Sequence, residues 1–245
     1  QVAGVGAIVV PIGGGGLISG VSLAVKSLRP DVRVIGVEAE NTASFTAALR
    51  NGQPVRIDTK PTLADGLAVG KVGDLAFSIA RRHVDEVVTV NEESLALAIF
   101  RLIELEKSVV EGAAAAPLAA CLNGKLSGLA GKRVVLVLSG GNIDLTILDR
   151  VIEHGLVTDG RLCRFTAIIS DRPGGLATLA SLIASTGASI KDITHDRAFS
   201  GPDVTIVRAV CVVETTDHQH VERLLQVIHQ AGIKVIPGLR DVSPG

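Results

Sequence analysis

Four consecutive glycines constrain this chain more than any other feature. Gly13 to Gly16 separate an apolar run at residues 7–12 from a segment at residues 17–28 whose apolar residues recur at helical spacing. Without Cβ atoms, the glycine backbone reaches dihedral angles closed to other residues and can lie close to a ligand. Its N–H groups and the start of the following helix form a cluster of donors suited to a phosphate. The pattern predicts a strand, an anion-binding loop and a helix, with a flexible linker as the alternative.

Apolar runs and amphipathic segments alternate through the first 150 residues. Strands are expected at residues 7–12, 32–38, 84–90 and 133–138, and helices at residues 17–28, 43–50, 72–83, 92–107 and 112–122. Asn91 is a suitable N-cap for the fourth helix, and Glu92 and Glu93 favour its first turn through the helix dipole. The last strand is nearly all apolar, which predicts a strand covered on both faces. This order predicts an α/β domain with a parallel sheet.

The pattern changes after about residue 155. Strands are expected at residues 163–170, 188–198, 203–215 and 233–236, and helices at residues 176–186 and 218–231. This βαββαβ order is the ferredoxin-like arrangement. We therefore expect two domains, residues 1–155 and 162–240, with a boundary within residues 153–161.

Composition excludes several classes of protein. Hydrophobic residues make up 47% of the 245 residues and charged residues 20%, as in globular proteins. The net charge of −1 provides no basic surface for nucleic acid or an anionic membrane. No apolar run is long enough to span a membrane and no signal peptide opens the chain, so we expect a soluble, cytoplasmic protein.

The chain has no Met and begins with Gln1, which predicts the C-terminal part of a longer protein. Its three cysteines form no C-x-x-C pair and are expected to be free thiols.

The identity of the phosphate ligand is not settled by the glycines alone. The P-loop pattern G-x-x-x-x-G-K-[ST] is absent, and the dinucleotide pattern G-x-G-x-x-G fails because Ile18 and Ser19 stand at its third glycine. Glu38 ends the next strand 25 residues after Gly13, roughly where an acid that binds a ribose would lie. A nucleotide therefore remains an alternative ligand.

Four motifs in the same order resemble a known family. They are P-I-G-G-G-G-L-I-S-G at residues 11–20, T-L-A-D-G-L-A at 62–68, V-E-G-A at 110–113 and L-S-G-G-N at 138–142. Together they are similar to the threonine/serine dehydratases, which belong to the fold type II, tryptophan-synthase-β-like enzymes that use pyridoxal phosphate. The resemblance covers about residues 1–150.

The resemblance implies roles for particular residues. Gly13, Gly14, Gly15, Gly16 and Leu17 would hold the phosphate of pyridoxal phosphate. Ser139 would face the pyridine nitrogen; a hydroxyl there can bond a neutral nitrogen, whereas a carboxylate would keep it protonated. The weaker electron sink that results favours β-elimination over transamination. Glu111 would either lie at the edge of the cofactor or cap the Ala-rich helix.

Other family features are missing from this sequence. The Schiff-base lysine of the family lies in an S-F-K-type motif before the glycine loop, and none of the lysines here stands in such a motif. The catalytic lysine is therefore expected in a preceding segment, and this chain alone is expected to be inactive. Serine racemases of the family bind a metal through two acids six residues apart; Glu38 matches the first, but Ser44 replaces the second. No metal site is therefore predicted.

Residues 163–237 resemble the ACT domain found at the C-terminus of many threonine dehydratases. The resemblance implies pairing with a second copy, and hence a homo-oligomer, with an amino-acid effector bound near the first turn. The candidate effector-binding residues are Asp171, Gly174, Gly175 and Leu176, where the glycines free backbone N–H groups at a helix start. A domain that only dimerises is the alternative.

The resemblance as a whole implies deamination of L-threonine or L-serine, small amino-acid substrates, to a 2-oxo acid and ammonia. A racemase or a β-replacement enzyme is the nearest alternative. A non-catalytic protein that binds an effector or forms oligomers is an alternative from another class.

Overall fold

A computed structural model describes residues 2–196 and 205–237 of the chain. It divides the protein into two compact units, residues 1–151 and residues 152–245.

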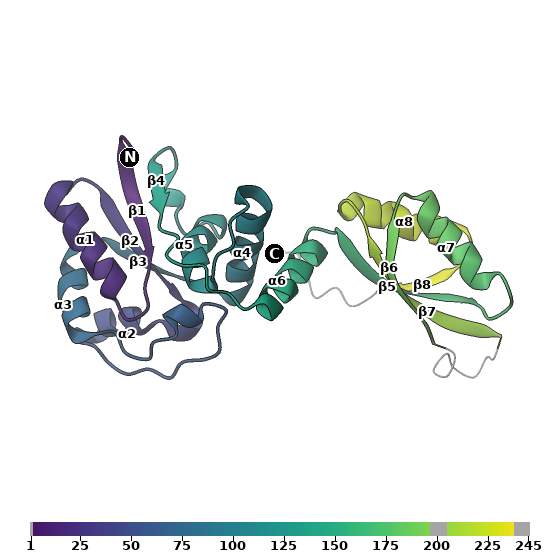
Figure 1. The fold of residues 1–245 in the computed structure, drawn as a ribbon, viewed down its shortest axis with the longest axis horizontal. Coiled ribbons are helices and arrows are strands. Elements are labelled where there is room, and N and C mark those ends of the chain that lie inside the picture. The colour runs from purple at the N-terminus through teal and green to yellow at the C-terminus, as the bar shows by residue number, and fades with distance from the viewer. Residues whose placement is uncertain (1, 197–204, 238–245) are drawn as a thin grey trace. The chain divides into compact units, whose positions relative to one another are not determined.

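A four-stranded parallel sheet forms the centre of the first unit, in the order β3-β2-β1-β4 (Figure 1). The strands are β1 (Val5–Pro11), β2 (Arg33–Ala39), β3 (Glu86–Val90) and β4 (Arg133–Leu136). Because every pairing is parallel, all four carboxyl ends lie at one edge of the sheet.

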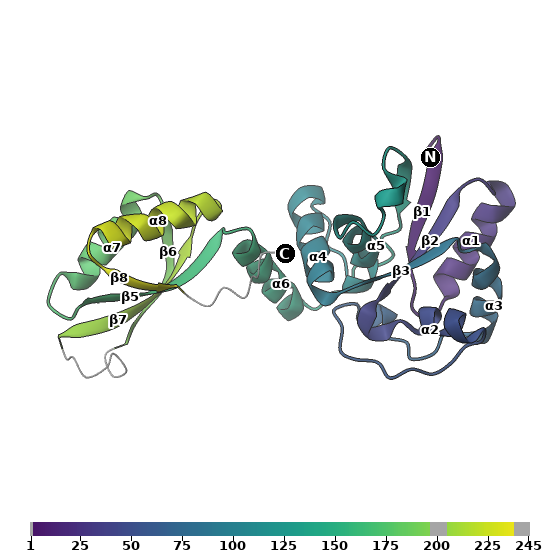
Figure 2. The same cartoon turned by 180° about the vertical axis from the view of Figure 1, so that it is seen from behind.

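Helices cover both faces of this sheet (Figures 1 and 2). One face carries α1 (Gly16–Leu28), α2 (Ser44–Asn51) and α3 (Asp74–His83), and the other carries α4 (Glu92–Glu106) and α5 (Gly112–Leu122). Three short 3-10 turns, Glu40–Thr42, Asp65–Leu67 and Ser127–Leu129, lie between these elements. The first helical layer packs through buried apolar side chains such as Ile18, Phe45 and Phe77, which meet the sheet at Val10 and Ile12. The predicted parallel α/β arrangement is confirmed.

The strand predicted at residues 133–138 is present as β4 but ends at Leu136. It is an edge strand of the described sheet, with Arg133 exposed and the next three residues half buried. The predicted cap is confirmed, since the side chain of Asn91 accepts a hydrogen bond from the N–H of Ser94 at 2.9 Å.

The second unit has an antiparallel sheet in the order β6-β7-β5-β8. Its elements follow the order βαββαβ and are β5 (Leu162–Ser170), α7 (Gly175–Ser185), β6 (Ser189–Asp196), β7 (Ile206–Glu214), α8 (His218–Gln230) and β8 (Lys234–Pro237). The expected ends of two strands, at residues 197–198 and 203–204, lie outside the described residues. A further helix, α6 (Leu145–Thr158), was not predicted from the sequence and occupies much of the expected linker.

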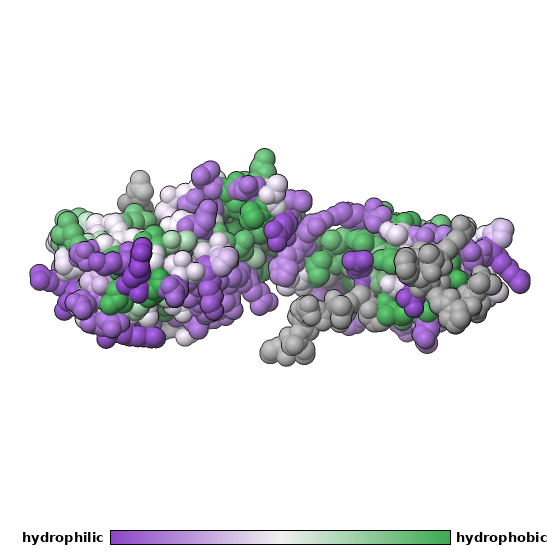
Figure 3. All heavy atoms as spheres, turned by 90° about the horizontal axis from the view of Figure 1, so that it is seen from below, coloured by the Kyte–Doolittle hydropathy of each residue, from purple (hydrophilic) through white to green (hydrophobic). Residues whose placement is uncertain are grey.

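Helices α7 and α8 share one face of the second sheet. Leu179 and Ile183 from α7 and Leu224 and Ile228 from α8 are buried against inward-facing residues of β5 and β7, which include Phe165. Hydrophobic side chains also reach the surface of both units (Figure 3). None of the helices in the described ranges has the length and apolar character needed to cross a membrane.

Candidate cofactor site

The carboxyl edge of the parallel sheet gathers the motifs that the sequence singled out. The glycine loop follows β1, and Ser139 follows β4, the strand that pairs with β1. The backbone N–H of Val137 donates to the carbonyl of Val9 at 3.0 Å, which keeps the chain after β4 beside β1. Ligands of open α/β sheets bind in the crevice outside this edge, so the position is suited to a site.

The glycine loop presents backbone donors at the start of α1. Gly15 is the N-cap residue with φ of 86°, in the left-handed region that favours glycine, and no side chain caps the helix. In the described part of the chain, no acceptor takes the N–H groups of Gly14, Gly16 or Leu17, and all three residues are exposed. A Cβ built on Gly14 or Gly16 would meet no atom within 4 Å. These donors are open to a ligand, and a negative charge there would be stabilised by the helix dipole.

The T-L-A-D-G-L-A segment packs against the glycine loop at Gly13. A Cβ on Gly13 would lie 2.9 Å from the carbonyl oxygen of Gly66 and 3.2 Å from the Cα of Leu67. The N–H of Gly73 donates to the carbonyl of Gly14 at 3.1 Å. Gly13 therefore has to be a glycine because another backbone segment packs directly against it.

Glu111 links the remaining two motifs. It is the N-cap residue of α5, but its side chain makes no capping hydrogen bond, so the structure does not support the capping interpretation. Its carboxylate instead lies against Gly140, where an added Cβ would be 2.9 Å from the Glu111 Cδ. Its backbone N–H donates to the carbonyl of Gly140 at 3.3 Å, and its Oε1 would lie 3.8 Å from a Cβ on Gly66. All four motifs therefore meet around the carboxyl edge.

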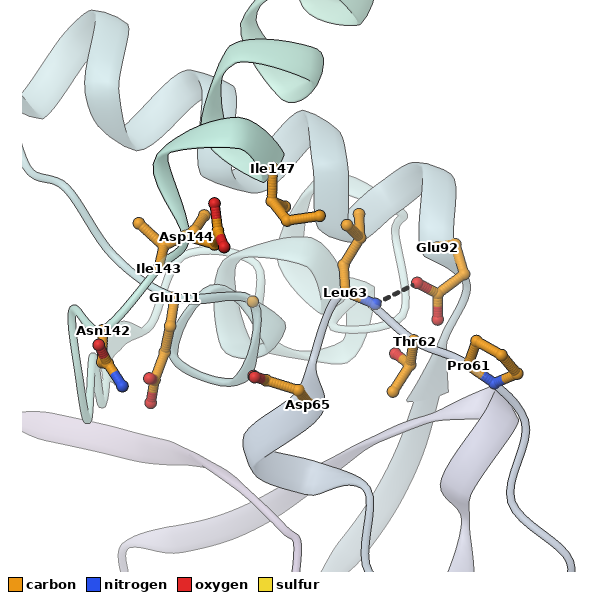
Figure 4. Close-up of a pocket in the computed structure, with 11 residues that line it drawn as sticks. Pro61, Thr62, Leu63, Asp65, Glu92, Glu111, Asn142, Ile143, Asp144 and Ile147 are labelled. Carbon is orange, nitrogen blue, oxygen red and sulfur yellow. Dashed lines mark hydrogen bonds between the residues drawn. The ribbon is translucent and has the colours of Figure 1, made fainter.

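A cavity of about 380 Å³ opens next to Glu111 (Figure 4). Its wall carries carboxylates and apolar side chains, among them Asp65, Glu92, Glu111, Asp144, Leu63, Ile143 and Ile147. Sequence reasoning did not identify Glu92 or Asp144 as members of a site. The only signal for Glu92 was its place in the first turn of a helix, which suggested a dipole effect alone. Asp144 precedes α6 and accepts from the N–H and Oγ1 of Thr146, both at 2.7 Å, and the Thr146 hydroxyl bond lowers the pKa of Asp144.

Glu38 has a different function from the one suggested by its spacing. It is fully buried, and its two oxygens accept hydrogen bonds from the N–H groups of Phe45 at 2.7 Å and Thr46 at 2.8 Å. The Thr46 hydroxyl also donates to Glu38. Burial raises the pKa of Glu38 above its usual value, although these hydrogen bonds oppose the change. Glu38 therefore caps α2 from inside the protein, and the ribose-binding interpretation is wrong because both oxygens are occupied.

No group of three or more His, Cys, Asp or Glu side chains within the described ranges is arranged to hold a metal ion. Ser44, which stands where serine racemases have their second acid, is buried at the start of α2. Its hydroxyl has no hydrogen-bond partner among the residues that the structure describes.

The candidate effector residues lie together at the turn between β5 and α7. Gly174 is the N-cap of α7 with φ of 95°. The N–H of Asp171 donates to the carbonyl of Thr205 at 3.0 Å, and that of Gly175 donates to the carbonyl of Arg172 at 3.1 Å. The expectation that Gly175 contributes a free N–H is therefore wrong, because the turn itself uses this donor. The N–H groups of Gly174 and Leu176 have no acceptor within the described residues.

Residues 1–140 match the family model described as pyridoxal-phosphate dependent enzyme. The chain belongs to this family. One protein to which the chain is similar is an L-threonine ammonia-lyase of Thermotoga maritima. The two are 47% identical over 228 residues, which cover 93% of this chain and 56% of that protein. The chain thus spans about half the length of the curated relatives it matches.

Two solved structures resemble the chain over more than half of its length. The threonine deaminase of T.th. is 40% identical with a TM-score of 0.54, covering 57% of this chain and 51% of that one. Serine racemase of Dictyostelium discoideum is 34% identical with a TM-score of 0.55, covering 59% of this chain and 46% of that one.

The residues present fit the phosphate end of this cofactor. The open N–H groups of Gly14, Gly16 and Leu17 are donors without competing acceptors in the described ranges, and the first turn of α1 contains no acidic side chain to repel an anion. Ser139 is exposed at the same edge, where it can reach a ligand.

Proposed function

We propose that the whole protein deaminates L-threonine, L-serine or both to a 2-oxo acid and ammonia with pyridoxal phosphate. The single observation that carries this proposal is the convergence of the four motifs, from different strands and loops, on one edge of the sheet. The similarity to L-threonine ammonia-lyase over 93% of this chain supports the substrate class. When bound, pyridoxal phosphate supplies an electron sink for the loss of the substrate's β-hydroxyl.

The residues of this chain would bind and orient pyridoxal phosphate. They would not remove the Cα proton of the substrate. The N–H groups of Gly14, Gly16 and Leu17 would hold the phosphate, and the dipole of α1 would stabilise its charge. The hydroxyl of Ser139 would donate a hydrogen bond to the ring nitrogen and leave that nitrogen unprotonated. Glu111, packed against Gly140, would fix the loop that carries Ser139. No lysine of this chain stands in the S-F-K-type motif of the family, so none is assigned the removal of the Cα proton.

The phosphate site can be tested with one added charge. In the full-length protein, Gly16→Asp places a carboxylate among the proposed phosphate donors, at a position where an added Cβ meets no other atom. An acid in the first turn stabilises a helix, so the fold is expected to persist. Affinity for pyridoxal phosphate, measured by titrating the cofactor-free protein and following absorbance, is expected to fall by at least about tenfold because like charges repel.

Gly20→Asp is the matched control, since Gly20 is equally open and lies one turn further along α1. It is expected to leave cofactor affinity within about twofold, because it lies outside the first turn, where the dipole and the free N–H groups act. Full-length protein that binds the cofactor but forms no oxo acid from threonine or serine would contradict the proposed reaction. Chiral analysis of the remaining amino acid separates a racemase from a lyase.

For the second unit, we propose that residues 162–240 form a regulatory ACT-type domain in a cytoplasmic homo-oligomer. The βαββαβ order supports this assignment, and the N–H groups of Gly174 and Leu176, which have no acceptor within the described residues, support an amino-acid effector at this turn. Sedimentation of the full-length protein with and without candidate amino acids tests the pairing and its response to an effector.

A further inference from the structure

Two side chains outside the four motifs, those of Asn41 and Glu92, bind the backbone of residues 61–63. This segment leads into the T-L-A-D-G-L-A motif, which packs against the glycine loop. Asn41 follows β2 and Glu92 follows β3, each two residues after the strand ends. The final residues of these strands, Ala39 and Val90, are direct partners in the parallel register. The register therefore brings Asn41 and Glu92 together at the carboxyl edge.

These two side chains bind the segment that begins the T-L-A-D-G-L-A motif. Glu92 Oε2 accepts from the backbone N–H of Leu63 at 2.7 Å, as Figure 4 shows, and Glu92 Oε1 accepts from Asn41 Nδ2 at 3.3 Å. Asn41 Nδ2 also donates to the carbonyl of Pro61 at 2.7 Å. The backbone of Asn41 completes the attachment, since its carbonyl accepts from the N–H of Lys60 at 3.1 Å.

The attachment continues to the cofactor site through the backbone. The carbonyl of Leu63 packs directly against Gly112, the residue after Glu111. The N–H of Leu67 donates to the carbonyl of Ala64 at 2.8 Å, which closes the turn that places Gly66 over Gly13. A shift of Leu63 would therefore move the backbone that packs against the first glycine of the loop.

We propose that Asn41 and Glu92 are positioning residues for the glycine loop, acting through the backbone of residues 60–67. A carboxylate is suited to this task because a hydrogen bond from an N–H to a charged acceptor is stronger than one between neutral groups. Glu92 is half buried, which limits competition from water for the Leu63 N–H. The cofactor part of this inference rests on the proposed function.

The test compares Glu92→Ala and Asn41→Ala with Glu93→Ala in the full-length protein. Glu93 is an exposed acid in the same helical turn, so its removal reproduces the loss of charge near the helix N-terminus without touching the loop. Two quantities are measured. The first is amide hydrogen exchange in residues 60–67 and in the glycine-loop segment, where the N–H groups of Ser19 and Gly73 donate to the carbonyls of Gly15 and Gly14. The second is the dissociation constant for pyridoxal phosphate.

Glu92→Ala is expected to speed exchange in both segments at least about tenfold and to weaken cofactor binding about tenfold, whereas Glu93→Ala changes neither by more than about twofold. Asn41→Ala is expected to act in the same direction. Glu92→Gln is expected to be intermediate, because its single amide oxygen can accept from Leu63 while its amino group cannot accept from Asn41.

Unchanged exchange at Ser19 and Gly73 in Glu92→Ala would overturn the proposal, as would faster exchange with unchanged cofactor affinity. If Glu92→Ala does not fold, Asn41→Ala and Glu92→Gln provide the same comparison. If the unmodified protein does not bind pyridoxal phosphate, the proposed function fails, and exchange at Ser19 and Gly73 still decides the positioning role.

Discussion

Glu38 and Glu92 are acids at the same edge of one sheet, and their surroundings give them different uses. Glu38 is fully buried, and within the described ranges it bonds only to the first turn of α2, so it belongs to the interior of the fold. Glu92 remains partly accessible and lines the cavity beside Glu111. The sequence suggested Glu38 as a ribose-binding acid because of its spacing from Gly13. Spacing does not reveal that both carboxylate oxygens already accept hydrogen bonds from α2.

At the residue scale, we predict that Glu38 makes stability depend on pH. Because burial raises the folded-state pKa above the usual 4.5, the native state keeps its proton over a range where the unfolded chain has lost it. The free energy of unfolding should therefore fall as pH rises from about 4.5 through the folded-state pKa. Urea unfolding of the wild type and Glu38→Gln at several pH values checks this.

The stability of the wild type relative to Glu38→Gln is expected to be greatest at low pH and to decline as the pH rises, since Gln does not titrate. A difference that grows with pH would mean that the hydrogen bonds from Phe45 and Thr46 outweigh burial.

At the scale of elements, the start of α4 combines local capping with a long-range contact. Asn91 accepts from Ser94 and so fixes the first turn. This leaves Glu92, the first residue of the helix, free to bind Leu63 across the carboxyl edge. Asn91 and Glu92 can both be read from the sequence. Only the contact between Asn91 and Ser94 joins near neighbours, so only that contact could be predicted from a local pattern.

We predict that Asn91→Ala destabilises the protein by about 1 kcal/mol, because a backbone N–H at the helix start loses its acceptor. Asn91→Asp should retain most of this stability, since a carboxylate also caps and favours the helix dipole. Denaturant unfolding measures both changes. Asn123→Ala, at the exposed C-terminal end of α5, is the control and should change the free energy of unfolding by less than about 0.5 kcal/mol.

At the scale of the whole molecule, each unit has its own hydrophobic core. The core around Phe165, Leu179 and Leu224 consists entirely of side chains of the second unit. In the same way, the core around Ile18 and Phe45 belongs entirely to the first. A unit that buries its own core needs no partner segment to remain folded.

We predict that residues 152–245, produced alone, unfold cooperatively on heating. Leu224→Ala removes a fully buried side chain and should destabilise this isolated unit by about 2–5 kcal/mol. Leu176→Ala, at a partly exposed position of α7, is the comparison and should cost less. Calorimetry of the three proteins decides the matter, and a broad, gradual transition in the unmodified unit would contradict the prediction.

Local patterns account for what the sequence determined by itself. The glycine loop between β1 and α1, the cap at Asn91 and the order of most elements depend on contacts between near neighbours, so periodicity and residue type were sufficient. The helix α6 was not predicted, and β4 ends at Leu136 rather than at the predicted residue 138.

The tertiary structure decided which distant residues meet. Gly66 packs on Gly13, Glu111 lies against Gly140, and Glu92 binds Leu63 because parallel strands place their carboxyl ends at one edge. No local pattern specifies the strand order or the register that produces these contacts. The sequence determined the parts of the candidate site by their chemistry, and the pairing of strands far apart in the chain determined their assembly.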